Sequence, residues 1–377
     1  MPILDPAISR RSFFRFAAGA SALASLPFVT EADLARAQQG HHIGDSRKGI
    51  HIDSNENPLG PCDAAREAAH KKVEDGGRYH FDMEHELAVL FAKQEGLDPS
   101  NVRVYAGSSE PLAYTVLAFA NPSRPLVIAD PGYEAAGFAA KRAGAKTIPV
   151  PLADPNGAAV HDIKAMMSAA SNPGVVYICN PNNPTGTCTP RADLEQAAAS
   201  AKGDTVLLID EAYVHFCDAP RSIDFVKEGR NVIVLRTFSK LYGMAGMRMG
   251  FAIGRPDLLK KLDYFGRNFL PTTAESAAIA SLQEPNLIET RKKSNADTRT
   301  AALDWCRQQG YAVTPSESNC FMLDTRRPGK QVLDAMAAKD VYIGRIWPSW
   351  PTQVRITVGT PDEMQTFRTA FTQVMAT

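Results

Sequence analysis

The sequence predicts a doubly wound α/β domain with a mostly parallel sheet, followed by a smaller α+β domain. Short apolar runs rich in branched residues are each closed by polar or turn residues, which is typical of strands buried on both faces. Helical patterns separate these runs, and beyond Gly254 the alternation loosens into longer helical stretches. The buried runs lie at 126–129, 175–178, 206–209 and 232–235.

Other elements are expected before and after the buried runs. Residues 84–95 place Leu87, Leu90 and Phe91 on one helical face, which predicts an amphipathic helix. Branched residues at 102–106 predict a further strand. The remaining expected elements are an extended stretch at 49–61, helices at 275–282 and 287–309, and strands at 321–323 and 354–358.

These elements predict the division of the chain into domains. We expect an amino-terminal arm with part of the small domain at 38–75, a large domain at 76–265 and a carboxy-terminal small domain at 266–377. Ligands of open α/β sheets bind beyond the carboxyl ends of the strands, so the chemistry is expected at that edge of the large domain.

The composition narrows the possible classes of function. The 377 residues are 44% hydrophobic and 22% charged, which supplies a packed core and excludes a disordered chain. Lys and Arg total 41, and so do Asp and Glu, so no net charge attracts nucleic acid or a membrane surface. No stretch approaches the roughly 20 apolar residues of a membrane span. The six cysteines contain no C-x-x-C pair, so no metal is expected.

The amino terminus has the features of an export signal. An arginine pair and two phenylalanines at 10–14 precede a weakly hydrophobic run at 16–29, and A-R-A at 35–37 offers a signal peptidase site. This order resembles a twin-arginine signal over residues 1–37, cleaved before Gln38, so we expect the export machinery to deliver a folded protein to the periplasm or otherwise outside the cytoplasm. The alternative is a short amphipathic helix with chance arginines.

The strongest chemical signal is the segment 237–250, which follows a buried strand. Lys240 is flanked by hydroxyl residues and followed by Arg248 among glycines. The lysine supplies an amine for a Schiff base, and the arginine supplies a guanidinium that can bind a phosphate through two hydrogen bonds. Asp210 closes the strand before it, with Tyr213 three residues on. A carboxylate at that position can keep a pyridinium nitrogen protonated.

These segments resemble the fold-type I aminotransferases that use pyridoxal 5′-phosphate, and more narrowly the histidinol-phosphate aminotransferase family. The resemblance runs from about residue 52 to residue 371. Seven motifs in order are very improbable by chance. Besides the lysine segment, the motifs are N-E-N-P-L-G at 55–60, G-S-S-E at 107–110, D-P-G-Y at 130–133, N-P-N-N-P-T-G at 180–186, D-E-A-Y at 210–213 and R-I-T-V-G-T at 355–360.

The resemblance implies a role for each cofactor residue. Lys240 would form the internal aldimine and then shuttle the proton, and Asp210 would pair with the pyridine nitrogen. Asn183 and Tyr213 would hydrogen-bond the phenolic oxygen, and Tyr133 would stack on the ring. The phosphate would be held by Ser108, Ser109, Thr237, Ser239 and Arg248.

The resemblance also implies substrate contacts and a homodimer. Arg355 would grip the substrate α-carboxylate, with Asn57 assisting, and Arg345 matches a family position that contacts the distal phosphate of histidinol phosphate. Tyr79 matches a tyrosine that reaches the cofactor phosphate of the neighbouring subunit. The proline that usually follows that tyrosine is His80 here.

Two segments depart from the family on the substrate side. Trp347 and Trp350 stand where smaller residues are usual, and aromatic walls would suit a flat or cationic substrate. Residues 267–272 also lack the usual P-F-N pattern. Histidine biosynthesis is cytoplasmic, so export argues against an enzyme of that pathway.

The sequence therefore predicts an enzyme that moves an amino group between an L-amino acid and a 2-oxo acid. Racemisation, β-elimination or cyclisation of an amino acid on the same cofactor stays open. A non-catalytic binding protein on this scaffold is a further alternative, which the joint presence of Lys240, Asp210, Tyr213, Arg248 and Arg355 opposes.

Overall fold

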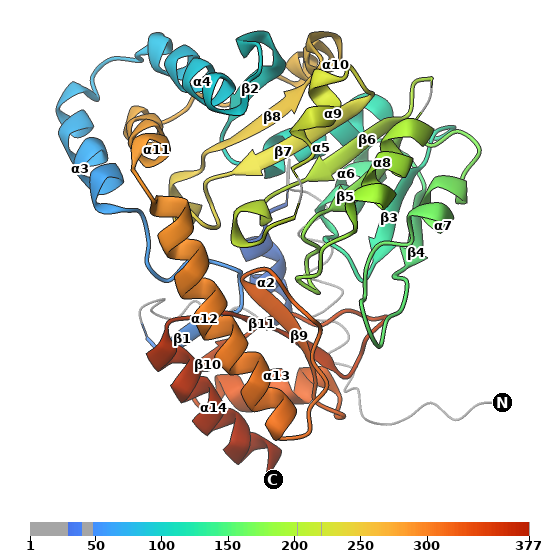
Figure 1. Cartoon of the computed structure of the whole chain (residues 1–377), viewed down its shortest axis with the longest axis vertical. Helices are drawn as coiled ribbons and strands as arrows, with labels where there is room; N and C mark the ends of the chain where they lie inside the picture. Colours follow the sequence, from blue (N-terminus) through green and yellow to red (C-terminus); the bar gives the residue numbers. More distant parts are fainter. Residues whose placement is uncertain (1–28, 40–47, 202, 220, 377) are drawn as a thin grey trace.

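The computed structural model describes residues 29–39, 48–201, 203–219 and 221–376, and its large domain is built on a seven-stranded sheet (Figure 1). The strand order is β2-β8-β7-β6-β5-β3-β4. β8 runs antiparallel to both neighbours and the other strands run parallel to one another, which confirms the predicted mostly parallel sheet. The strands are β2 (Val102–Tyr105), β3 (Leu126–Asp130), β4 (Thr147–Pro151), β5 (Val175–Cys179), β6 (Val206–Asp210), β7 (Val232–Thr237) and β8 (Gly250–Gly254).

Helices cover both faces of this sheet because successive strand side chains point to opposite faces. Leu207 and Ile209 of β6 belong to one hydrophobic core, whereas Leu208 between them belongs to another. The first core includes α4 (Phe81–Glu95), α7 (Ile163–Ser168), α8 (Arg191–Ser200) and α9 (Ile223–Lys227). The second includes α5 (Ser109–Phe119), α6 (Ala135–Arg142) and α10 (Pro256–Leu262). The domain is thus doubly wound, as predicted.

The small domain has two short sheets and its own core. β1 (Ile50–Ile52) pairs in parallel with β10 (Val341–Ile343), and β9 (Cys320–Asp324) pairs antiparallel with β11 (Gln353–Thr357). Three helices pack with these strands in a third hydrophobic core, at the bottom of Figure 1. They are α12 (Leu287–Gln308), α13 (Gly329–Ala337) and α14 (Pro361–Met375).

The helix α11 (Thr272–Gln283) lies with the large domain, although the predicted boundary after residue 265 assigns it to the small one. Its buried alanines share a hydrophobic core with α4 and with Ala65 of α3 (Asp63–Lys72). Figure 1 shows the three helices together beside β2. A helical period reveals that a helix has an apolar face, but not which domain covers that face.

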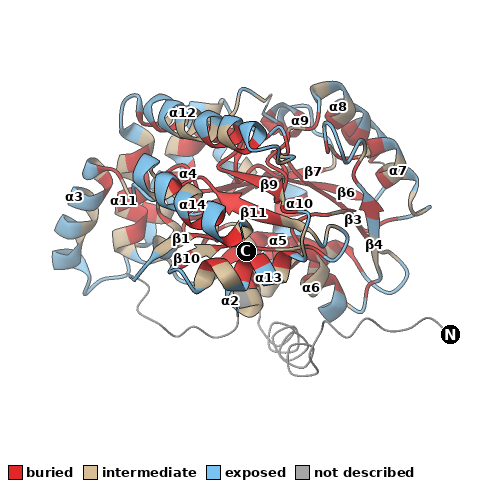
Figure 2. Ribbon diagram, turned by 90° about the horizontal axis from the view of Figure 1, so that it is seen from below, coloured by how far each residue is buried: buried red, intermediate tan, exposed pale blue. Residues whose placement is uncertain are grey.

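Figure 2 shows the central strands buried while the surrounding helices expose their outer faces. No helix within 29–39, 48–201, 203–219 and 221–376 is long and apolar enough to cross a membrane. Short 3-10 turns complete the fold: η1 (Val73–Asp75), η2 (Pro99–Asn101), η3 (Val214–Phe216), η4 (Ala245–Met247) and η5 (Asp263–Phe265).

The amino-terminal helix α2 (Glu31–Gln39) lies where the two domains meet (Figure 1). Val29 and Leu34 pack in the second core of the large domain. The Gln38 side-chain amide donates to the main-chain oxygen of Ile346 at 2.9 Å and accepts from its N–H at 2.8 Å. The predicted cleavage point before Gln38 therefore falls inside a docked helix, and the arginine pair at 10–11 lies outside the described residues.

Candidate active site

A cavity of about 260 Å³ opens at the carboxyl ends of the parallel strands. Segment 30–32 forms part of its wall, together with loops that follow β1, β2, β3, β5, β6 and β7. Every predicted cofactor residue except Tyr79 lines this cavity: Ser108, Ser109, Tyr133, Asn183, Asp210, Tyr213, Thr237, Ser239, Lys240 and Arg248. The structure thus brings together side chains that lie up to 140 residues apart in the chain.

Lys240 follows β7 and is buried in this cavity. Its Nζ donates a hydrogen bond to the main-chain oxygen of Ser54 at 3.2 Å and lies 5.6 Å from the centre of the Tyr213 ring. Burial lowers the pKa of Lys240, and the nearby carboxylate of Glu31 partly opposes that shift. A buried amine that loses its proton more easily is suited to act as a nucleophile and a base.

Asp210 is the last residue of β6, and its carboxylate is held by two donors. The Tyr177 hydroxyl donates to Oδ2 at 3.0 Å and the Ala212 N–H donates to Oδ1 at 3.1 Å. Burial raises the pKa of Asp210 to about 6, against the effect of both hydrogen bonds. Tyr177 was missed by the sequence analysis, because it lies inside an apolar strand and no motif marks it.

Hydrogen-bond donors gather at the other end of the cavity. The Arg248 Nη1 donates to the Ser239 hydroxyl at 3.3 Å, and the Thr237 hydroxyl donates to Ser239 at 3.0 Å. Ser108 is the N-cap residue of α5, and it lines the cavity together with Ser109 in the first turn of that helix. A guanidinium, hydroxyl groups and a helix amino terminus are the donors that bind a phosphate.

Gly107 allows the guanidinium of Arg248 to approach the start of α5. Its φ is +87°, and a Cβ at this position would collide with the Arg248 guanidinium. A Cβ on Gly250 would lie 2.8 Å from the Ser108 nitrogen. Gly107 is therefore favoured by its positive φ, and Gly250 by the close approach of the neighbouring backbone.

Arg345 and Arg355 converge on one carboxylate. Both are fully buried, and the Nη1 of each lies 2.8 Å from Oε1 of Glu31. The Arg355 Nη1 also donates to Oδ1 of Asn183 at 2.9 Å, and the Arg345 Nη2 forms an ion pair with Glu134. The predicted carboxylate-binding arginine therefore does hold a carboxylate, which belongs to the chain itself.

Glu31 is a second residue of the site that the sequence analysis did not identify. Its Oε2 accepts a hydrogen bond from Nδ2 of Asn183 at 2.8 Å. Burial raises its pKa, but the charges of Arg345, Arg355 and Lys240 outweigh burial and lower the pKa to about 2. Nothing in the sequence distinguishes this glutamate from the rest of the predicted signal segment.

Trp347 and Trp350, which the sequence suggested as aromatic side chains beside the substrate, are placed differently relative to the cavity. Neither residue lines the cavity, and the Trp347 ring lies under the guanidinium groups of Arg345 and Arg355, 4.7 and 5.8 Å from their central carbons. Trp347 also donates its indole N–H to the Gly132 oxygen at 2.9 Å. The tryptophan supports the two arginines by cation–π contact.

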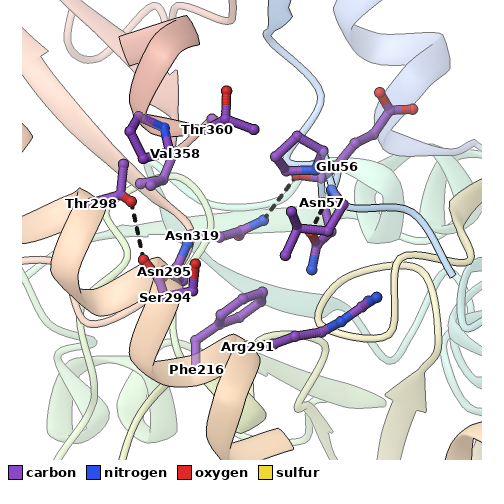
Figure 3. Close-up of a pocket in the computed structure, with 14 residues that line it drawn as sticks. Glu56, Asn57, Phe216, Arg291, Ser294, Asn295, Thr298, Asn319, Val358 and Thr360 are labelled. Atoms are coloured by element: carbon purple, nitrogen blue, oxygen red, sulfur yellow. Dashed lines mark hydrogen bonds between the residues drawn. The ribbon is translucent and has the colours of Figure 1, made fainter. Parts of the chain in front are cut away.

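Asn57 does not face this cavity, in contrast to its predicted substrate role. Its amide donates to the main-chain oxygen of Leu241 at 2.8 Å, and the residue lines a separate pocket between the two domains with Arg291 and Asn319 (Figure 3). The neighbouring Asn55 faces inward, where its amide donates to the Tyr213 hydroxyl at 3.0 Å. Within the motif at 55–60, the residue that contacts the cofactor-binding side chains is therefore Asn55, through Tyr213.

Tyr79 is 70% exposed and lies outside the cavity. Its ring lies 5.5 Å from that of Phe81 and 5.4 Å from that of Phe269, and both phenylalanines are exposed as well. We call Tyr79, Phe81 and Phe269 the aromatic patch. Among the residues that the structure describes, no group of three or more His, Cys, Asp or Glu side chains is arranged to hold a metal ion.

Comparison with known proteins decides the family. The model of the family described as aminotransferase class I and II matches residues 47–371. The chain belongs to the class I and II aminotransferases. This aminotransferase uses pyridoxal 5′-phosphate to move an amino group between an amino acid and a 2-oxo acid, which confirms the predicted fold, cofactor and reaction.

Individual relatives agree with this assignment. The aminotransferase is 32% identical to a histidinol-phosphate aminotransferase of Moorella thermoacetica, over 87% of this chain and 86% of the relative. It is 33% identical to an aromatic amino acid aminotransferase of Cutibacterium acnes, over 85% and 91%. A histidinol-phosphate aminotransferase of Sinorhizobium meliloti, solved in complex with pyridoxal 5′-phosphate, superposes with a TM-score of 0.80 at 26% identity, over 98% and 99%.

The residues of the cavity fit this cofactor. The buried carboxyl of Asp210 can meet a protonated pyridine nitrogen, and the donors around Ser239 and Arg248 can meet a phosphate. The amine of Lys240 lies in the same cavity as both. These are the three chemical requirements of pyridoxal 5′-phosphate in an aminotransferase.

Proposed function

We propose that the aminotransferase acts on L-amino acids whose side chain carries no anionic group, and that Lys240 moves the proton. When bound, pyridoxal 5′-phosphate supplies an electron sink that makes the substrate α C–H acidic. The Nζ of Lys240 takes the proton from the α carbon, because burial favours the neutral amine. The Asp210 carboxylate holds the positive charge at the pyridine nitrogen.

The remaining roles concern binding and orientation. Ser108, Ser109, Thr237, Ser239 and Arg248 would hold the phosphate, Tyr133 would contact the ring, and Asn183 and Tyr213 would hydrogen-bond the phenolic oxygen. Arg355 binds the substrate α-carboxylate, which orients the α C–H relative to the ring. The full burial of Arg355 supports this role, because a desolvated guanidinium binds a carboxylate more strongly than an exposed one does.

The ion pair between Arg345 and Glu134 carries the proposal for the substrate class. In the family, the position of Arg345 contacts a distal phosphate, but here Glu134 already neutralises the guanidinium. A second anion on the substrate would have to compete with this carboxylate. The likeness to an aromatic amino acid aminotransferase is consistent with an uncharged side chain.

Steady-state kinetics with three donors test the substrate class. We expect a higher kcat/KM for L-phenylalanine than for L-aspartate or L-histidinol phosphate. Histidinol phosphate is the second candidate because of the relatives that carry its name. A higher kcat/KM for histidinol phosphate would contradict the proposal and would mean that Arg345 exchanges Glu134 for the phosphate.

We also propose that the active form is a homodimer. The aromatic patch supports it, because three exposed aromatic side chains next to one another are typical of a contact surface. Tyr79 would then reach the cofactor phosphate of the partner. Light scattering of the purified protein tests whether it is a dimer. Tyr79→Ala is expected to weaken cofactor binding. A monomer with full activity would contradict the proposal of an active homodimer.

The proposal for export rests on the sequence pattern at 1–37. The twin-arginine machinery would carry the folded protein to the periplasm, with cleavage before Gln38. Cell fractionation of the full chain and of a variant with Arg10→Lys and Arg11→Lys tests it. Equal amounts of both proteins in the exported fraction would contradict the proposal.

A further inference from the structure

We propose that residues 29–37 act as an internal competitor, in which the carboxylate of Glu31 occupies the place of the substrate α-carboxylate until the segment is released. The inference rests on the proposed role of Arg355. The sequence assigned residues 29–37 no role other than as part of the predicted export signal at 1–37.

The contacts of Glu31 are those of a bound substrate carboxylate. One oxygen meets the guanidinium groups of Arg345 and Arg355 at 2.8 Å, and the other accepts from the Asn183 amide at 2.8 Å. Glu31 is only 8% exposed. A substrate carboxylate that needs Arg355 must therefore displace Glu31.

The charges of the site lead to the same conclusion. Two buried guanidinium groups, of Arg345 and Arg355, form ion pairs with two carboxylates, of Glu31 and Glu134. A substrate carboxylate that enters while Glu31 is in place finds both guanidinium groups already paired, and a buried carboxylate without such a partner is unfavourable. The same carboxylate arriving after Glu31 has left would restore the balance.

The segment is anchored on both sides of Glu31. Val29, Leu34 and Ala35 are buried, and the Tyr133 hydroxyl donates to the Val29 oxygen at 3.3 Å. The side chain of Asp33 accepts from the Thr30 N–H at 2.9 Å, which orders the start of α2. A tethered ligand held in this way acts at an effective concentration on the order of millimolar, so ordinary amino acid concentrations compete poorly with it.

Cleavage at the predicted site would release the competitor. Hydrolysis of the Ala37–Gln38 peptide bond adds water across the bond, leaving a carboxylate on Ala37 and an amine on Gln38. Residues 1–37 then become a separate peptide that dilution removes, whereas Gln38, which forms two hydrogen bonds with Ile346, stays with the rest of the chain. The uncleaved chain can therefore fold around its cofactor while substrate is excluded, and it gains activity once it is processed.

Kinetics and binding with the uncleaved full chain, verified by intact mass, test the inference. Glu31→Gln and Glu31→Ala remove the competing charge, and Arg36→Gln changes an exposed residue of the same helix as a matched control. We expect both Glu31 variants to lower the KM for L-phenylalanine by about tenfold or more with kcat little changed. Calorimetry should show tighter binding of phenylpyruvate to both variants, and Arg36→Gln should match the wild type.

A Glu31 variant with an unchanged or higher KM and no gain in phenylpyruvate binding would overturn the inference. Selective loss of activity on cationic donors would also overturn it, because Glu31 would then be a specificity residue of the working site. If the variants gain phenylpyruvate affinity but transfer no amino group, the proposed function fails while the internal competitor stands. Mass analysis of the exported protein should find an amino terminus at Gln38; an exported, active protein that keeps residues 29–37 would refute release by cleavage.

Discussion

The hydroxyl of Tyr177 donates a hydrogen bond to Oδ2 of Asp210 across 3.0 Å, and both residues are buried. This bond lowers the pKa of Asp210, whereas burial raises it, and the balance is a pKa of about 6. We therefore expect cofactor affinity to increase as the pH rises through about 6, because the ionised carboxylate pairs with the pyridine nitrogen.

Tyr177→Phe should raise the pKa of Asp210 further. A lost hydrogen bond of about 1 kcal/mol moves the midpoint of the pH profile up by roughly 0.5 to 1 unit. The measurement is a fluorescence titration of the apoprotein with cofactor between pH 5 and 8. Tyr105→Phe is the control, because it removes a buried hydroxyl without a hydrogen-bond partner in the described part of the chain. An unshifted midpoint would mean that Tyr177 does not tune Asp210.

The sign of the linked stability effect follows from the same pKa. The folded-state value of about 6 lies above the ordinary 3.8, so the folded apoprotein binds the proton more tightly than the unfolded chain does. The contribution of Asp210 to apoprotein stability is therefore greatest at acidic pH and is lost as the pH rises through about 6. Bound cofactor should prevent this loss of stability, because its protonated pyridine nitrogen would pair with the ionised Asp210 carboxylate.

Arg248→Ala should weaken cofactor binding by roughly 10- to 100-fold, because it removes a charge-assisted contact to the phosphate. Equilibrium dialysis of the cofactor measures this directly. Arg255→Ala is the matched control, since Arg255 forms a partly exposed ion pair with Asp257 at 2.8 Å. Equal cofactor affinities of the two variants would refute the phosphate role of Arg248.

Glu134→Gln should free the guanidinium of Arg345 for a distal anion. We expect kcat/KM for L-histidinol phosphate to rise by about tenfold relative to that for L-phenylalanine, because one competing carboxylate is removed. The measured quantity is the ratio of the kcat/KM values for the two substrates, so a general loss of activity does not affect it. An unchanged ratio would show that Glu134 does not set the substrate class.

Asn57→Ala should leave the KM of the donor within about twofold, because its amide binds the Leu241 oxygen rather than a substrate. The lost hydrogen bond should lower the free energy of unfolding by about 1 kcal/mol. Asn55→Ala is the contrasting variant and should change cofactor binding through Tyr213. A large increase in KM for Asn57→Ala would restore its predicted substrate role.

The sequence was sufficient to predict the strands that are buried on both faces, because their branched residues form uninterrupted apolar runs. It was not sufficient for β4, which contains two prolines, or for β8, whose three apolar residues lie between glycines and resemble a turn. The motif residues that line the cavity were found because each follows the end of a strand, where the fold brings distant segments together.

The missed residues share a physical cause, because each acts through a neighbour that is distant in sequence. Tyr177 matters only because its hydroxyl reaches Asp210, and Glu134 only because it meets Arg345. Trp347 supports two arginines rather than lining the cavity, which its type alone does not reveal. Glu31 lies 314 residues before Arg345, and local pattern carries no information on that contact.

The visible absorption spectrum of the cofactor-loaded protein tests the central claim most directly. L-phenylalanine should bleach the cofactor band and phenylpyruvate should restore it, whereas Lys240→Ala should show no such reversible change. The uncleaved chain should need a higher amino acid concentration than the processed one for the same bleaching. A band that no amino acid bleaches reversibly, or a Lys240→Ala protein that behaves like the wild type, would contradict amino transfer by Lys240.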